Sequence, residues 1–293
     1  MEQADSSLIL YAVMFMSALG LVLAGALAIA NRFLWVYEDP RIGEVEELLP
    51  ATNCGACGTA GCHPFAEALI KGDVVPANCT VSSSEAREEI AGLLGVDAGD
   101  VEKVVARLAC AGGNHVASNR SHYEGLDTCQ AASIVAGGPK SCVWGCLGLA
   151  DCEDVCDFDA ITMDRNGLPV VSEDLCTACG DCVEVCPKNL FSLHPVSHKL
   201  WVACANLQND ELAESACEVA CTACERCAVD SPDGLIKIEN HLAVIDYSQN
   251  ALASPVATER CPTGAIVWLD GKAGIRKGRE SKRIIRKKSL PLS

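Results

Sequence analysis

Aromatic and basic side chains are scarce in this chain of 293 residues. Phe, Trp and Tyr make up only 4% of it, which argues against a core built mainly from aromatic packing. Lys and Arg number 23 against 39 Asp and Glu, a formal net charge of −16. Nucleic acids are bound through clusters of positive charge, so the body of the protein is not expected to bind them. No basic residue precedes the first apolar run, which disfavours a cleavable secretory signal.

The basic residues that are present gather at the C-terminal end. From residue 271 onward the chain carries nine of the 23 Lys and Arg and one acid, so this tail is about +8 and the rest about −24. The tail is either a solvated disordered end or a segment that docks on anionic lipid or an acidic partner. The acidic remainder is typical of electron carriers and favours basic protein partners.

Cysteine is the residue type in excess. The 20 cysteines would suit either a secreted disulfide scaffold or a set of metal sites. Many are separated by two residues, which is ligand spacing, and no signal peptide precedes them. The sequence therefore predicts reduced thiolates that bind metal and supply much of the folding free energy.

The most informative stretch is Cys176-Thr-Ala-Cys-Gly-Asp-Cys-Val-Glu-Val-Cys-Pro187. Three cysteines in steps of three, a fourth four residues on and then proline form the run of bacterial ferredoxins, in which the fourth cysteine ligates a neighbouring cluster. Two residues between ligands let successive thiolates reach three corners of one [4Fe–4S] cubane. Zinc sites more often use two well-separated Cys-x2-Cys pairs, so zinc is the weaker interpretation.

A looser copy of this run lies upstream. Cys142-x3-Cys146-x5-Cys152-x3-Cys156 is followed by Asp157 in place of proline and by a Phe-Asp-Ala-Ile segment that we expect to be a strand. Exchange of the fourth ligands between the two runs predicts two cubanes. The predicted ligands of the first are Cys142, Cys146, Cys152 and Cys186. Those of the second are Cys176, Cys179, Cys182 and Cys156.

The pattern begins a third time at Cys221-x2-Cys224-x2-Cys227, and Cys261-Pro-Thr-Gly-Ala-Ile resembles its far end. One cubane lacks its four ligands together, since the expected positions hold Ser231, Ala251, Ser254 and Ala257. The other keeps all four: Cys221, Cys224, Cys227 and Cys261. The sequence predicts a two-cluster module that has lost one cluster, with a hairpin formed by residues 235–238 and 243–246. The alternative is that Cys261 is an ordinary buried thiol.

A different arrangement stands nearer the N-terminus: Cys54-x2-Cys57-x4-Cys62-x16-Cys79. Four thiolates complete the ligand set of one cubane, and the glycines among them let the backbone fold tightly and aim N–H groups at its sulfurs. His63 follows directly, but it is not expected to be a fifth ligand. Helices are expected over 64–71, 86–94 and 100–108, the second starting at Ser82–Ser84.

An uncharged apolar run of about 23 residues extends from Leu8 to Ala30. As a helix it is roughly 34 Å long, enough to cross a bilayer. Gly20 and Gly25 give it a small-residue face suited to close helix packing. Acids precede the run while Arg32 and Arg41 follow it, so we expect a retained anchor with the C-terminal side in the cytoplasm. Trp35 and Tyr37 stand where interfacial aromatic residues belong.

Four cysteines match no ligand spacing of these motifs: Cys110, Cys129, Cys204 and Cys217. Buried packed thiols are the default interpretation. A fifth cluster or a redox pair are the alternatives.

The order of anchor, Cys54–Cys79 motif and ferredoxin-type modules resembles the iron–sulfur subunit, designated B, of the Rnf family, the ion-translocating ferredoxin:NAD oxidoreductases of bacterial membranes. Asn53-Cys-Gly-Ala-Cys-Gly and Cys142-Val-Trp-Gly-Cys-Leu-Gly-Leu-Ala-Asp-Cys are its most specific parts. The resemblance implies electron transfer from soluble ferredoxin towards membrane-embedded and flavin-bearing subunits, coupled to ion pumping. It also implies that the Cys54–Cys79 cluster lies near the membrane.

The expected fold class is α+β: one transmembrane helix, a small mostly helical 4Fe–4S domain and ferredoxin-like modules. We expect an anchor (1–31), a 4Fe–4S domain (32–100), a connector (101–140), a two-cluster module (141–200), a one-cluster module (201–270) and a basic tail (271–293). No nucleophile, base or substrate pocket is apparent, so the expected mechanism is electron tunnelling along about four [4Fe–4S] clusters. A ferredoxin-like subunit of another membrane oxidoreductase and a zinc-stapled interaction protein are the rival interpretations.

Overall fold

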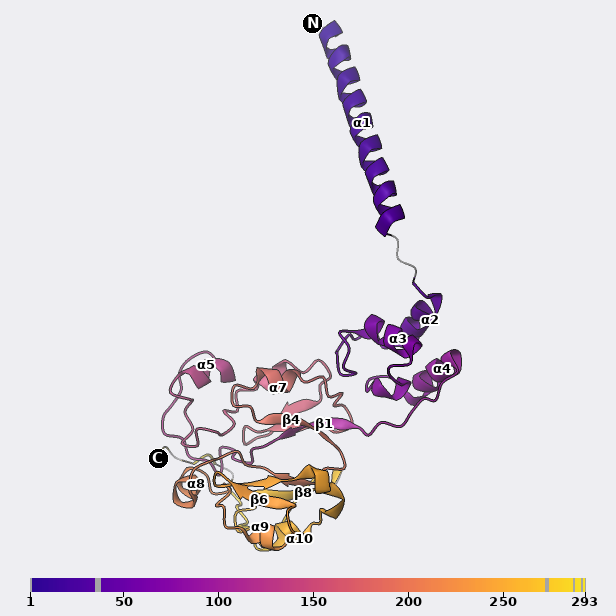
Figure 1. Ribbon diagram of the computed structural model, residues 1–293. Coiled ribbons are helices and arrows are strands. Elements are labelled where there is room, and N and C mark those ends of the chain that lie inside the picture. Colours follow the sequence, from indigo (N-terminus) through magenta and orange to yellow (C-terminus); the bar gives the residue numbers. More distant parts are fainter. Residues whose placement is uncertain (1, 35–37, 272–273, 287, 291, 293) are drawn as a thin grey trace.

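The computed structural model describes residues 2–34, 38–271, 274–286, 288–290 and 292, with side chains from residue 10 onward. Trp35 and Tyr37, the expected interfacial aromatics, lie outside the described residues. Figure 1 shows three successive parts: a helix that stands alone, a small helical unit, and a body of short helices and paired strands. The chain thus mixes helix and strand.

The isolated helix α1 spans Glu2–Leu34. It contains no proline, and the part from Leu10 to Leu34 is long and apolar enough to cross a membrane. Its large apolar side chains are exposed, with Phe15 at 68% and Phe33 at 82%. Because such a surface is costly in water, the helix requires an apolar surrounding that the rest of the chain does not supply.

The helical unit packs three α-helices and one 3-10 turn around a small apolar core. Val45, Phe65 and Ile90 lie at its centre, each at most 1% exposed. Asp39 caps the first helix by accepting the N–H of Arg41, and Ser83 caps the last. The elements are α2 (Pro40–Leu48), α3 (Cys62–Lys71), η1 (Pro76–Asn78) and α4 (Ser84–Leu94).

The predicted helix over 100–108 is wrong. Residues Val104–Leu108 form the strand β1, which pairs antiparallel with β4 (Phe191–Pro195), so that Leu108 faces Phe191. The two adjacent valines favour a strand, and a partner more than 80 residues away in the chain supplies the hydrogen bonds that local periodicity could not anticipate.

The upper half of the body, around β1 and β4 in Figure 1, carries short elements between its cysteines. The strand expected over 158–161 begins only at its last residue, because the chain turns at Asp157 and Phe158 and bends at Asp159. The elements are α5 (Cys129–Ile134), α6 (Asp151–Asp154), β2 (Ile161–Met163), β3 (Pro169–Val171) and α7 (Asp181–Val185), with β2 and β3 antiparallel.

The lower half repeats this plan. The expected hairpin is confirmed, since β6 (Ile236–Glu239) and β7 (Leu242–Ile245) pair antiparallel. A second sheet has the strand order β5-β8-β9. The remaining elements are β5 (Leu200–Val202), α8 (Asp210–Ala216), α9 (Arg226–Val229), η2 (Tyr247–Leu252), α10 (Val256–Glu259), β8 (Ile266–Leu269) and β9 (Ile275–Lys277).

Aromatic rings join the two halves. The Tyr247 and His198 rings stack with centroids 4.1 Å apart, and Trp201 meets His194 edge-on at 4.9 Å. The Trp201 indole N–H also donates to the carbonyl oxygen of Leu108, at the end of β1, over 2.8 Å. These contacts fix β5 of the lower half beside β1 and β4 of the upper half.

The described part of the basic tail packs against acidic residues of the same chain. Arg279 pairs with Glu259 at 2.7 Å, Arg286 pairs with Glu218 at 3.1 Å, and Lys282 pairs with Glu214. Its strand β9 adds to the edge of β8. Of the two alternatives for the tail, the solvated disordered end is therefore wrong for these residues, and three of the nine basic side chains pair with carboxylates of the same chain in these contacts.

Gly278→Ala should loosen this tail. A Cβ at position 278 would stand 1.9 Å from the carbonyl oxygen of Thr258 in α10, so backbone must move, at a cost of about 1–3 kcal/mol. We expect a lower midpoint of thermal unfolding for the anaerobically purified protein. Gly92→Ala is the control, since nothing lies within 4 Å of a Cβ there; an equal midpoint in both variants would contradict the tight approach.

Candidate iron–sulfur sites

The four cysteines of the N-terminal motif line one cavity of about 280 Å³ in the helical unit. Cys62 begins α3 and Cys79 follows η1, so the first turn of one helix and the end of another converge on the cavity. Asn53 accepts the N–H of Cys62 over 2.8 Å, and the Ser82 hydroxyl donates to the Cys79 sulfur over 3.1 Å. The structure therefore gathers Cys54, Cys57, Cys62 and Cys79 with hydrogen bonds that orient them.

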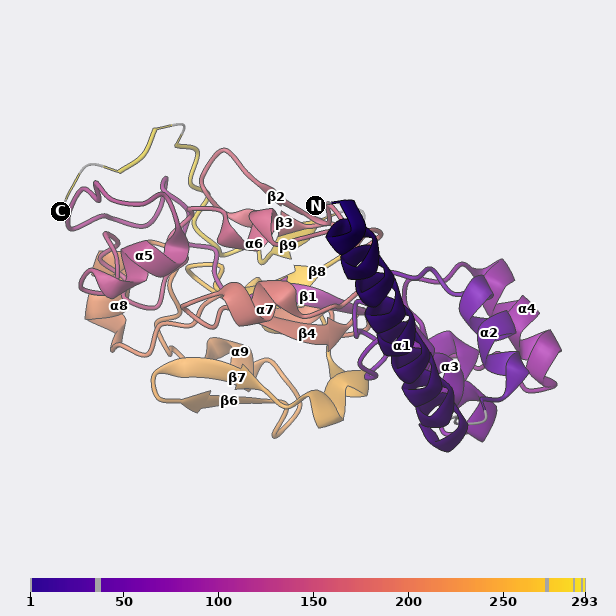
Figure 2. The same cartoon turned by 90° about the horizontal axis from the view of Figure 1, so that it is seen from above.

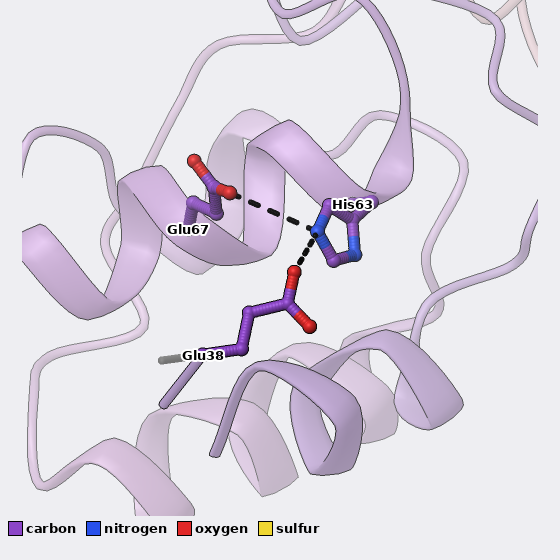
Figure 3. Close-up of side chains that lie close together, drawn as sticks. All are labelled: Glu38, His63 and Glu67. Atoms are coloured by element: carbon purple, nitrogen blue, oxygen red, sulfur yellow. Dashed lines mark ion pairs between the residues drawn. The ribbon is translucent and has the colours of Figure 1, made fainter. Parts of the chain in front are cut away.

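His63 lies outside this cavity and is held by carboxylates. Its Nδ1 is 2.8 Å from Glu46, and Figure 3 shows Nε2 facing Glu38 at 3.4 Å and Glu67 at 3.7 Å. The hydrogen bond to Glu46, followed by the charges of the three glutamates, raises the pKa of His63. With both ring nitrogens engaged, the imidazole has no part in the sulfur cavity.

The second cavity, of about 330 Å³, is lined by Cys156, Cys176, Cys179 and Cys182. Cys182 lies on α7, while Cys156 follows α6, so the fourth cysteine comes from the other run of the module. The backbone N–H of Ala106, in β1, points at the Cys176 sulfur over 3.4 Å. Left-handed backbone at Ala178 and Gly180 turns the loop around the cavity.

A third cavity of about 350 Å³ is lined by Cys221, Cys224, Cys227 and Cys261. The Ser231 hydroxyl donates instead to the carbonyl oxygen of Cys227 over 2.6 Å. Ala257, where another ligand would stand in a full module, is 2% exposed and part of an apolar core. At this position the structure packs an apolar side chain instead of a ligand.

The predicted set of Cys142, Cys146, Cys152 and Cys186 is not brought together. Cys142 instead lines a cavity of about 340 Å³ with Cys110, Cys204 and Cys217, none of which was predicted as a ligand. Cys142 is therefore placed with cysteines from distant segments rather than with the later cysteines of its own run.

Cys129 lies near the cysteines of this run that do not line that cavity. The Asp151 carboxylate, at the start of α6, accepts the N–H of Cys129 over 2.7 Å and thereby holds α5 against α6. Burial, followed by the neighbouring thiols of Cys129 and Cys186, raises the pKa of the Cys152 thiol to about 12. Cys129, Cys152 and Cys186 are thus neighbours, and Cys129 likewise raises the pKa of Cys146.

A repeated tripeptide could have revealed the missed cysteines. Ala-Cys-Ala occurs at 109–111 and again at 203–205, directly after β1 and just after β5. The N–H of Ala111 donates to the carbonyl oxygen of Ala203 over 3.0 Å, so the two copies lie side by side.

The thiol-lined cavities fit iron–sulfur clusters. The described cysteines are free thiols, mostly buried, and burial raises the pKa of Cys182, Cys204 and Cys227 to about 12. Such groups become thiolates only beside a cation, and backbone N–H groups aimed at sulfur are the usual means of stabilising them.

Comparison with known proteins agrees with this chemistry. The FeS family model, for an Fe-S cluster, matches residues 49–81, and a 4Fe-4S binding domain model matches residues 168–191. The subunit designated B in the Na(+)-translocating ferredoxin:NAD(+) oxidoreductase complex of Acetobacterium woodii is 38% identical over 88% of this chain and 77% of that protein. Its counterpart in the proton-translocating ferredoxin:NAD(+) oxidoreductase complex of Clostridium ljungdahlii is 38% identical over 86% and 89%. The counterpart in the ion-translocating oxidoreductase complex of Methanosarcina acetivorans is 33% identical over 89% and 98%.

These matches and the cysteine sites define an iron–sulfur protein of the electron-transfer class, associated with a membrane complex. More particularly, the chain belongs to the family of the iron–sulfur subunit designated B in the Rnf complex, the ion-translocating ferredoxin:NAD oxidoreductase.

Adjacent residues of the first site give a matched test. Cys62→Ala should lower the iron content by about four atoms per chain, because one cubane loses a ligand. His63→Ala should leave the iron content unchanged, because the imidazole faces carboxylates. Iron analysis of both proteins after anaerobic purification checks this; loss of iron from His63→Ala would contradict the geometry.

The third cavity provides a second pair. Cys261→Ala should also lose about four iron atoms per chain, whereas Ser231→Ala should lose none, because its hydroxyl bonds to backbone. If iron fell in Ser231→Ala, serine would be a ligand and the assignment of this site would be incorrect.

Proposed function

We propose that this chain is the electron-relay subunit of an ion-translocating ferredoxin:NAD oxidoreductase, receiving electrons from reduced ferredoxin. The observation that carries the proposal is the gathering of cysteines in fours at one site of the helical unit and at two sites of the body. [4Fe–4S] clusters bound there supply one-electron carriers. The protein's part is to place the sites in a row, exclude water and tune each site by hydrogen bonds and charge.

The membrane end of the row is the Cys54–Cys79 site. Only a short segment separates α1 from α2 of the helical unit, and Figure 1 shows this unit between α1 and the body. The Thr80 hydroxyl, next to Cys79, donates to the carbonyl oxygen of Thr177, next to Cys176, over 2.7 Å. Electrons can therefore pass between the second site and the membrane-near site across a direct contact.

The opposite end of the row is the Cys221–Cys261 site. Cys224 is the exposed cysteine of the described set, and Figure 1 places α9, which carries Cys227, at the end of the body away from α1. An edge open to solvent is where a soluble carrier can approach closely. We assign this end to ferredoxin, and the membrane-near end to the membrane-embedded and flavin-bearing subunits.

The anchor spans the bacterial inner membrane once in this proposal. Acids precede the apolar run, while Arg32 and Arg41 follow it. Positive residues flanking a span remain on the cytoplasmic side. The cluster-bearing units then face the cytoplasm, where ferredoxin and NAD are found.

Two single-site variants of the full chain in detergent test the direction. Reduced ferredoxin should bleach the broad visible absorption of the wild-type protein under anoxia. Cys261→Ala should slow this reduction at least tenfold, because the entry site is gone, while dithionite still reduces the remaining clusters. Cys54→Ala should keep the wild-type rate with a smaller amplitude.

The outcomes separate the alternatives. Slow reduction of Cys54→Ala with a normal rate for Cys261→Ala would reverse the assignment of the two ends. No reduction of the wild-type chain by ferredoxin would overturn the proposed function. Stoichiometric zinc with little iron would favour an interaction protein instead.

A further inference from the structure

We propose that Cys110, Cys142, Cys204 and Cys217 hold a further [4Fe–4S] cluster, which joins the two halves of the body, and that Cys129 completes the neighbouring site with Cys146, Cys152 and Cys186. No family match covers these added cysteines, since the matches end at residue 81 and resume at 168–191. The proposal rests on the iron–sulfur function only for the identity of the bound group.

The cavity itself is the first argument. The open space at this site, about 340 Å³ with the adjoining solvent included, is close to the 330 and 350 Å³ at the sites that the ferredoxin-type motifs line. Gly112 leaves room within it, because a Cβ there would stand 3.1 Å from the Cys217 sulfur and 3.6 Å from the Cys110 sulfur. Four thiols thus converge on a space of the size that the motif-defined sites have.

Hydrogen-bond donors surround these sulfurs. The backbone N–H groups of Gly112 and Cys146 point at the Cys110 sulfur over 3.4 and 3.5 Å. Those of Asn206 and Cys221 point at the Cys204 sulfur over 3.4 and 3.3 Å. Neutral thiols accept hydrogen bonds only weakly, whereas the thiolates that bind a cluster are stabilised by several N–H donors.

A buried amide is aimed at the same cavity. Asn206 is 1% exposed, and its Nδ2 donates to the Cys142 sulfur over 3.5 Å. Its Oδ1 accepts the N–H of Gln208 over 2.8 Å, which fixes the orientation of the amide. The amide is therefore held with its N–H group directed at the cysteine-lined cavity.

A buried cation adds charge complementarity. Lys140 is 2% exposed, and its ammonium donates to the carbonyl oxygen of Gly112, a residue that lines the cavity. The positive charge of Lys140 acts on Cys142, Cys146 and Cys217. Burial of an ammonium is costly unless negative charge lies nearby. A cluster with four thiolates supplies that negative charge.

The backbone repeats around the site. Cys110 follows β1 and Cys204 follows β5, each within an Ala-Cys-Ala segment. The two segments are paired by the Ala111–Ala203 hydrogen bond. Each half of the body therefore contributes one equivalent cysteine, and the cavity lies where the halves meet.

This cluster would close a gap in the row. Cys156 and Cys186 are exchanged between the upper sites. Cys146 donates its N–H to the Cys110 sulfur, and Cys221 donates its N–H to the Cys204 sulfur. Each contact links a ligand of one site to a ligand of the next, so five sites form a continuous path from the Cys224 end to the membrane-near end.

Iron and acid-labile sulfide per chain test the number of clusters. The full chain, purified in detergent without oxygen, should contain roughly 20 of each and should show no free thiol that reacts before denaturation. Roughly 16 of each, with four thiols reactive towards an alkylating reagent after mild unfolding, would overturn the proposal while leaving the electron-transfer function intact. A chain that contained little iron would instead contradict the proposed function.

Paired alanine variants test the ligand sets. Cys110→Ala and Cys217→Ala should each lose about four iron atoms, and the double variant should lose the same four, because both belong to one cluster. Cys142→Ala combined with Cys152→Ala should lose about eight. A loss of only four in this last pair would restore the sequence-based set and overturn the proposal.

A control guards against general unfolding. Ser231→Ala should retain full iron, and each variant should keep the wild-type elution volume. If Cys110→Ala loses more than four, low-temperature electron paramagnetic resonance of the reduced protein decides: signals of the Cys54–Cys79 cluster should persist in it. Unchanged iron in Cys110→Ala would overturn the proposal directly.

Discussion

The structure depends on one constraint: a small protein must place twenty thiols in positions that are mostly buried or half-buried. A thiolate away from water needs a cation and hydrogen-bond donors. The loops meet this need with N–H groups from β1, from the turn after Cys110 and from the start of the lower half. Regular elements in the body are correspondingly short, often three to five residues, because loop backbone is needed around the cavities.

The parts of the chain with local signals were predictable. The run from Cys176 indicated three of the cysteines that line its cavity, the third run and Cys261 line a cavity together, and the 235–246 hairpin is present. Each depends on spacing within a short segment. The long apolar helix α1 likewise follows from an uninterrupted apolar run.

The parts assembled from distant segments were not predictable in the same way. Cys110 and Cys204 are 94 positions apart, and neither has a neighbouring cysteine at ligand spacing. The sequence predicted a helix where β1 lies, because the strand that pairs with it, β4, is distant in the chain. For the basic tail, the sequence left two alternatives, a solvated end or a segment that docks on lipid or another protein. Its acidic partners Glu214, Glu218 and Glu259 come from three separate positions in the chain. In each case the missing information was tertiary pairing rather than propensity.

The contact between Thr80 and Thr177 has a mechanical meaning as well. The helical unit follows the apolar helix α1 along the chain and contacts the body through this hydrogen bond; Figure 2 shows the unit beside the body, with α1 crossing in front. Electron tunnelling decays exponentially with separation, whereas a hydrogen bond between two hydroxyl-bearing residues breaks with a small displacement. In the proposed relay, a displacement of a few ångströms between the helical unit and the body would therefore slow electron transfer at this contact.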